Sequence, residues 1–164
     1  MKSKSENSQT EWRQSEFTIS TERTRIDFAV VHDFLSRSYW ARNIPFEVVR
    51  RSIENSLCFG LFEAEKQIGF ARVVTDCATF AYLCDVFVVE KYRGRGLSKW
   101  LMETILAHPE LQNLRRWLLA TKDAHGLYSQ FDFTTLDSPS IFMQRHAPNV
   151  YPSVADENDK NNVD

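Results

Sequence analysis

The chain has 164 residues, of which 43% are hydrophobic, and its formal net charge is −2 at neutral pH. This length and apolar content suit one domain with a buried core, which we expect to span residues 15–150. The small net charge excludes a general electrostatic attraction to nucleic acid or to an anionic membrane, so we expect neither as a partner.

Both ends of the chain are polar. Residues 1–14 are rich in Ser, Glu and Gln, and residues 151–164 are polar and acidic. Such segments bury too little apolar surface to offset the entropy that ordering them costs. We therefore predict a disordered tail at each end.

No apolar run reaches the ~18 residues of a membrane-spanning helix. The three cysteines show no C-x-x-C spacing, which favours a reducing, cytoplasmic location and no metal site.

Between the tails, apolar spacing and turn residues predict alternating helices and strands. The strand at 82–89 is almost continuously apolar, which is typical of a strand buried on both faces. We expect a mixed α/β fold with helices on both faces of one sheet. In chain order, the predicted elements are a strand at 17–20, helices at 27–36 and 45–55, strands at 57–63, 67–75 and 82–89, a helix at 97–107, a strand at 115–120, a short helix at 125–130 and a last strand at 140–145.

The most informative segment joins the apolar strand to the next helix. Gly94 and Gly96 can adopt a positive φ and let the backbone come close to a ligand. Arg93 and Arg95 add charge-assisted donors for phosphate oxygens. The helix begins near Leu97, where its first N–H groups are unpaired and its dipole attracts anions. The segment therefore predicts a binding site for a phosphate-bearing ligand.

Common nucleotide motifs do not describe this turn, because it lacks the third glycine of a dinucleotide fingerprint and the Gly-Lys-Ser/Thr of a P-loop. What remains is Arg-x-x-Gly-x-Ser, made by Arg93, Gly96 and Ser98. This pattern resembles the Gln/Arg-x-x-Gly-x-Gly/Ala signature of the GNAT superfamily, the acetyl-CoA-dependent N-acetyltransferases, with Ser98 as the small third residue. The resemblance implies a mostly antiparallel sheet with a splay between its two central strands, and acetyl-CoA as the acyl donor.

A second segment carries the same resemblance. After the strand at 115–120, the residues from Thr121 to Phe133 are similar to the superfamily's second CoA-contacting segment. The resemblance places Thr121 and His125 beside the cofactor. It implies that Tyr128 protonates the departing CoA thiolate. Asp132 stands where the family usually has glycine.

The resemblance also implies direct transfer of the acetyl group to a primary amine, with no covalent enzyme intermediate. In the family, the strand at 82–89 holds the pantetheine arm through its backbone, which assigns that contact to Phe87 and Val88. Asp85 interrupts this apolar strand and is our candidate for the general base, since an amine attacks only when neutral. The structural alternative is that Asp85 hydrogen-bonds a nearby donor in the core.

Acceptor binding is assigned to the segment 37–45, which mixes aromatic residues with arginines. Tyr39 and Trp40 are its candidate contacts; in the alternative, this segment is a rigid turn and Trp40 fills the core. The acceptor is a small-molecule or peptide amine of open identity, and a homodimer is compatible with the sequence.

Two other classes compete with an enzyme. A binding module would keep the CoA site without turnover and act as a sensor. A nucleic-acid binder would use Arg93, Arg95, Arg115 and Arg116, but the overall acidity opposes it.

Overall fold

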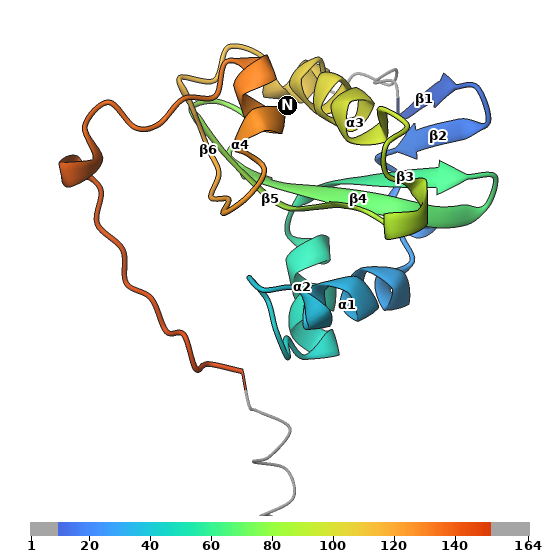
Figure 1. The fold of residues 1–164 in the computed structure, drawn as a ribbon, viewed down its shortest axis with the longest axis horizontal. Helices are drawn as coiled ribbons and strands as arrows, with labels where there is room; N and C mark the ends of the chain where they lie inside the picture. The colour runs from blue at the N-terminus through green and yellow to red at the C-terminus, as the bar shows by residue number, and fades with distance from the viewer. Residues whose placement is uncertain (1–9, 152–164) are drawn as a thin grey trace, which may run out of the picture.

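A six-stranded sheet forms the centre of the protein (Figure 1). The computed structural model describes residues 10–151. The strands are β1 (Glu11–Gln14), β2 (Phe17–Ser20), β3 (Leu57–Glu63), β4 (Lys66–Thr75), β5 (Phe80–Val88) and β6 (Arg116–Leu118). They neighbour one another in chain order, and every pair is antiparallel except β5–β6, which is parallel. The predicted mixed, mostly antiparallel sheet is confirmed.

Helices cover both faces of this sheet, as predicted. The helices α1 (Phe28–Arg37) and α2 (Phe46–Glu54) lie on one face, and α3 (Leu97–Leu106) and α4 (His125–Tyr128) lie on the other (Figure 1). Each face buries its own cluster of apolar side chains against its helices. The sheet is thus held from two sides, which fixes the positions of its strand ends.

The helix α1 shows how the sequence builds one of these layers. The Asp27 carboxylate accepts hydrogen bonds from the backbone N–H groups of Ala29 and Val30 and caps the helix. Val31 and Leu35 follow on one face of the helix and are buried.

Strand β5 is irregular at the position that matters most for the site. On β4, Phe70 pairs with Phe87 and Arg72 pairs with Cys84, so two residues of β5 face one residue of β4. This is a β-bulge, and Asp85 within it has a φ of +55°. A positive φ is uncommon for a residue with a Cβ and costs about 1 kcal/mol, so the surrounding contacts must hold it.

Two predicted boundaries need correction. Strand β1 lies inside the range 1–14 that was predicted as a tail, because Trp12 packs against Phe59 and anchors the strand. Tyr151, the first residue of the predicted tail 151–164, packs against the α1–α2 cluster. The rest of both predicted tails, residues 1–9 and 152–164, lies outside the described residues.

Within the described part of the chain, no helix has the length and apolar character needed to cross a membrane.

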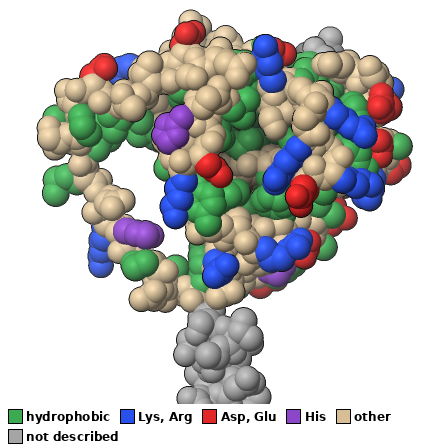
Figure 2. Space-filling view, in the orientation of Figure 1, with side chains coloured by type: hydrophobic (Ala, Val, Ile, Leu, Met, Phe, Trp, Pro, Cys, Tyr) green, Lys and Arg blue, Asp and Glu red, His purple; other side chains and the backbone are tan. Residues whose placement is uncertain are grey.

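The predicted last strand at 140–145 is wrong. A 3-10 turn occupies Pro139–Ile141, and the chain that follows pairs with no strand of the described part. Pro139 fixes its own φ and begins the turn, which interrupts an extended segment. Figure 2 shows this segment standing away from the body, so that an opening separates the two.

His108 is a buried titratable group in the core. The residue is 4% exposed, and the centre of its ring lies 5.8 Å from that of Trp12 and 5.5 Å from that of Phe59. Its Nδ1 accepts a hydrogen bond of 3.3 Å from the Glu110 N–H. Burial lowers the pKa of His108, and the nearby Glu110 charge only partly opposes this effect. The core therefore favours the neutral ring.

We predict that acidification destabilises the protein through His108. Because its pKa in the folded state lies below 6.5, the unfolded chain binds the proton more readily. The free energy of unfolding therefore falls as the pH drops below about 6.5. Urea unfolding at about pH 7.5 and about pH 5.5 measures the loss, which should be smaller in His108→Gln. An equal loss in both proteins would contradict this prediction.

Candidate functional site

The turn between β5 and α3 has the backbone shape that the sequence predicts. Gly94 has a φ of +78° and Gly96 a φ of +75°. A Cβ built on either glycine would meet nothing within 4 Å, so the backbone conformation, rather than crowding, requires glycine here. The residues from Arg93 to Gly96 are all exposed. The turn is therefore open to a ligand.

The first turn of α3 presents unpaired backbone donors. Gly96 is the N-cap, and no side chain caps the helix. The Trp100 N–H bonds to the Gly96 carbonyl at 3.0 Å, so the N–H groups of Leu97, Ser98 and Lys99 precede the first bond within the helix. Buried Leu97 fixes this end of the helix against the core. Free N–H groups at the positive end of a helix dipole make an anion site.

Basic side chains flank this turn. The Arg93 Nε donates a hydrogen bond of 3.0 Å to the Val88 carbonyl and so ties the end of β5 to the turn. The Arg95 guanidinium and the Lys91 ammonium lie 5.5 Å and 4.7 Å from the centre of the Tyr92 ring. Part of Arg93 is thus already engaged, whereas Arg95 is exposed beside the open turn.

Phe87 and Val88 lie just before the turn, and both are 4% exposed. The Phe87 ring stacks on Phe34 of α1 at 3.9 Å, whereas Val88 packs in the cluster on the α3 side. Their side chains thus point to opposite faces of the sheet. Only their backbone could contact a cofactor, as the prediction for these two residues requires.

The strands β5 and β6 separate after a short contact. Their pairing runs from Phe80–Arg116 through Tyr82–Leu118 and then stops, which leaves β6 at the edge of the sheet in the described residues. A pocket of about 160 Å³ lies where the strands part. Its lining residues are Tyr39, Trp40, Tyr82, Leu83, Cys84, Asp85, Val86, Ala120, Thr121, Asp123, Ala124 and Tyr128. The predicted residues Asp85, Tyr128, Tyr39, Trp40 and Thr121 therefore meet in one place.

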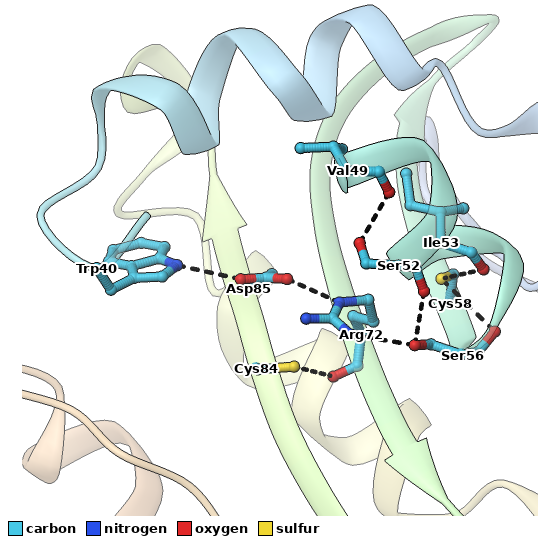
Figure 3. Close-up of polar contacts among 9 residues, drawn as sticks. All are labelled: Trp40, Val49, Ser52, Ile53, Ser56, Cys58, Arg72, Cys84 and Asp85. Atoms are coloured by element: carbon cyan, nitrogen blue, oxygen red, sulfur yellow. Dashed lines mark hydrogen bonds and ion pairs between the residues drawn. The ribbon is translucent and has the colours of Figure 1, made fainter. Parts of the chain in front are cut away.

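Asp85 is held by donors from two other elements (Figure 3). One carboxylate oxygen accepts a hydrogen bond of 2.7 Å from the Arg72 Nε, and the other accepts one of 3.2 Å from the Trp40 Nε1. Arg72 in turn donates to the Ser56 hydroxyl at 3.1 Å. These contacts match the structural alternative for Asp85. Two of its lone-pair positions are occupied, and the carboxylate still lines the pocket.

Tyr128 reaches the pocket from α4. It is 9% exposed, and its ring lies 6.0 Å from the Phe133 ring. Burial raises the pKa of Tyr128 to about 12. Within residues 10–151 its hydroxyl has no protein hydrogen-bond partner. The hydroxyl is therefore protonated at neutral pH and free to donate, and the residue lines the pocket.

The other residues predicted for the second segment lie nearby. The Thr121 hydroxyl accepts a hydrogen bond of 3.0 Å from the Ala124 N–H and shapes the approach to α4. His125 begins α4, but it is exposed and does not line the pocket. The Tyr39 hydroxyl accepts a hydrogen bond of 3.1 Å from the Lys122 N–H, which joins the predicted acceptor segment to this one.

Sequence reasoning missed three charged or hydroxyl-bearing residues that line or support the pocket: Arg72, Tyr82 and Asp123. The sequence does single out Arg72, because it is the one charged residue inside the otherwise apolar stretch from 68 to 74. Burial is the largest single effect and opposes its charge, but the charge and hydrogen bond of Asp85, together with Cys84 and Cys58, raise the pKa of Arg72 overall. In the described residues, no group of three or more His, Cys, Asp or Glu side chains could hold a metal ion.

We predict that the Arg72–Asp85 pair contributes to stability. Its side chains are 18% and 10% exposed, so Arg72→Met would strand a nearly buried carboxylate and lower the free energy of unfolding by about 2–4 kcal/mol. The exposed Arg37–Asp33 pair is the control: Arg37→Met should change the free energy by about 0.5 kcal/mol or less. Denaturant unfolding measures both, and equal effects would count against this role.

Three comparisons place the chain among known proteins. A family model for the acetyltransferase (GNAT) domain matches residues 54–135, which are 82 of the 164 residues. A crystal structure from Xanthomonas campestris pv. campestris, described as a candidate acetyltransferase of the GNAT family, is 48% identical, covers 84% of this chain and 97% of its own, and has a TM-score of 0.81. A relative from Gibberella zeae, described as a candidate acetyltransferase, is 26% identical and covers 73% of this chain and 79% of its own.

A more distant crystal structure shares the fold. It comes from Clostridium acetobutylicum and is described as an acetyltransferase with acetyl-CoA. It is 12% identical, covers 79% of this chain and 94% of its own, and has a TM-score of 0.59. The family match, the close structural relative and the open turn at α3 agree. The chain therefore belongs to the GNAT family of acetyltransferases.

Proposed function

We propose that this protein transfers an acetyl group from acetyl-CoA to the primary amine of a small-molecule or peptide acceptor. The observation that carries the proposal is the arrangement along β5: an open glycine turn and free α3 N–H groups lie at its end, and a pocket with Tyr128 lies beside its middle. The Clostridium acetobutylicum neighbour described with acetyl-CoA supports this choice of donor. The three cysteines are free, which supports a cytoplasmic location.

The residues present fit coenzyme A. The α3 N–H groups of Leu97 and Ser98, with the exposed Arg95, would bind the diphosphate. Beyond Tyr82, β5 has no pairing to β6, so its backbone is available to an extended ligand. When bound, acetyl-CoA supplies the thioester whose carbonyl carbon accepts the amine.

The reaction forms a C–N bond and breaks the C–S bond. The amine loses a proton, and the sulfur leaves with a proton as the thiol of CoA. Asp85 is our proposed base, acting through water because two of its lone-pair positions are already used. Tyr128 is the proposed donor to the sulfur, because its hydroxyl stays protonated well above neutral pH.

A covalent route through Cys84 is less suited to this pocket. Burial raises the pKa of Cys84 to about 12, and the thiolate, rather than the thiol, is the reactive form. The Cys84 Sγ also donates to the Arg72 carbonyl at 3.6 Å. Direct attack by the amine needs no protein nucleophile, only the alignment of two bound reactants.

We predict that Tyr128→Phe lowers kcat by about 100-fold and leaves acetyl-CoA binding nearly unchanged, because it removes only the hydroxyl. CoA release with a thiol reagent measures turnover, and the melting shift with acetyl-CoA measures binding. Since the pKa of Tyr128 is raised to about 12, this group should cause no loss of kcat on going to about pH 10. Unchanged turnover in the variant would remove Tyr128 from the mechanism.

We predict that acetyl-CoA at about 100 times its dissociation constant adds about 2.7 kcal/mol to the free energy of unfolding. Gly96→Val should lose most of this gain, because a side chain would project into the open turn and the φ of +75° disfavours valine. The unliganded variant should remain folded, at a cost of about 1–2 kcal/mol. A full melting shift in Gly96→Val would mean that the turn does not bind the cofactor.

The same experiments separate an enzyme from a binding module. A module would show the melting shift with acetyl-CoA and no CoA release with any amine. An enzyme shows both.

A further inference from the structure

The pocket beside Asp85 has walls of aromatic rings. Tyr39, Trp40 and Tyr82 line it and remain 47%, 43% and 37% exposed. Scattered exposed rings are ordinary, but a group of them around one hollow marks a surface that another molecule covers. The Tyr39 and Trp40 rings meet edge to face, with centres 4.9 Å apart. Each ring therefore holds the other in a defined orientation.

The charges around this pocket restrict what can enter it. Its charged lining residues are Asp85 and Asp123, and no lining residue is Lys or Arg. Arg72 is engaged by Asp85 and Ser56. Lys122, next in sequence to Asp123, has its ammonium 4.7 Å from the centre of the Tyr39 ring. Thus the Asp85 carboxylate already has a cation bound to it, and no unengaged cation of the described residues lines the pocket to receive an acidic group.

The aromatic walls are themselves uncharged. Burial raises the pKa of Tyr82 and of Tyr128, so both hydroxyls stay protonated at neutral pH. The pocket therefore offers aromatic rings and hydroxyl donors, and its Asp85 carboxylate is already paired with Arg72. Such a lining suits a flat apolar group.

We infer that the acceptor is an arylalkylamine: an amine on a short chain that carries an aromatic ring and no anionic group. This inference rests on the proposed transfer reaction and names the substrate class of the same pocket. The ring of the acceptor packs against Trp40 and Tyr82, and its amine reaches the Asp85 side of the pocket. A carboxylate or phosphate on the acceptor would be buried beside Asp85 without a partner.

Matched amines test the inference through steady-state CoA release at saturating acetyl-CoA. Phenylethylamine is the reference; cyclohexylethylamine has a similar size without a π face, phenylalanine adds a carboxylate, and diaminobutane adds a second cation. We expect kcat/KM for phenylethylamine to exceed that for cyclohexylethylamine by about 2- to 10-fold. It should exceed that for phenylalanine by about 100-fold, since an unpaired charge is costly to desolvate.

Two variants of one residue separate the Trp40 ring from its N–H. Both Trp40→Phe and Trp40→Leu lose the hydrogen bond to Asp85, but only Trp40→Phe keeps a π face. Trp40→Leu should lower kcat/KM for phenylethylamine by about 10-fold, mainly through KM, and Trp40→Phe by about 3-fold or less. Because Trp40 is 43% exposed, both variants should fold, and an unchanged KM for acetyl-CoA confirms an intact cofactor site.

The outcomes distinguish this inference from the proposed reaction. If phenylethylamine is no better than cyclohexylethylamine, or if phenylalanine or diaminobutane is the better acceptor, the inference is overturned and the transfer reaction stands. Equal effects of Trp40→Phe and Trp40→Leu also overturn it. If none of the four amines releases CoA, the inference is overturned, and a missing melting shift with acetyl-CoA removes the proposed cofactor as well.

Discussion

Strands β5 and β6 share only three residue pairs, which end at Tyr82–Leu118, and beyond them the strands diverge. This divergence leaves one side of β5 without a strand partner next to the turn that leads into α3. The bulge at Asp85 lies within the same stretch, so a carboxylate enters the pocket that the divergence opens. If the two strands paired along their whole length, neither the pocket nor the free backbone of β5 would exist.

The network around Asp85 joins parts of the chain that lie far apart in sequence. Trp40 belongs to the loop after α1, Arg72 to β4, and Ser56 to the connection between α2 and β3. Asp85 has a positive φ, which is strained for a residue with a Cβ. Its ion pair with Arg72 holds it in place, and the side chains of Arg72 and Asp85 are 18% and 10% exposed. The geometry of the pocket is thus coupled to the packing of the α1–α2 layer. A substitution that shifts this layer would also shift the side chains around Asp85.

The sequence predicts best what depends on neighbouring residues. The turn from 93 to 98 follows from two glycines and a helix start, and the structure has that shape. Arg72 was missed because its partner depends on the register between β4 and β5, and no local pattern encodes a bulge. Strand β1 was missed because most of its residues are polar, and the contact of Trp12 with Phe59 that anchors it is not visible in the sequence. The predicted strand at 140–145 is wrong because residues with high β-propensity form a strand only where a neighbouring strand pairs with them.

The alternation of Phe87 and Val88 has a consequence for tolerance to mutation. Both side chains are buried, one on each face of the sheet. A ligand that binds along this stretch can therefore contact only the backbone peptide groups of Phe87 and Val88. Peptide groups are the same whichever apolar residues carry them. Exchanges that preserve volume at these two positions should therefore change the melting point and spare ligand affinity, whereas a proline would remove a backbone donor outright.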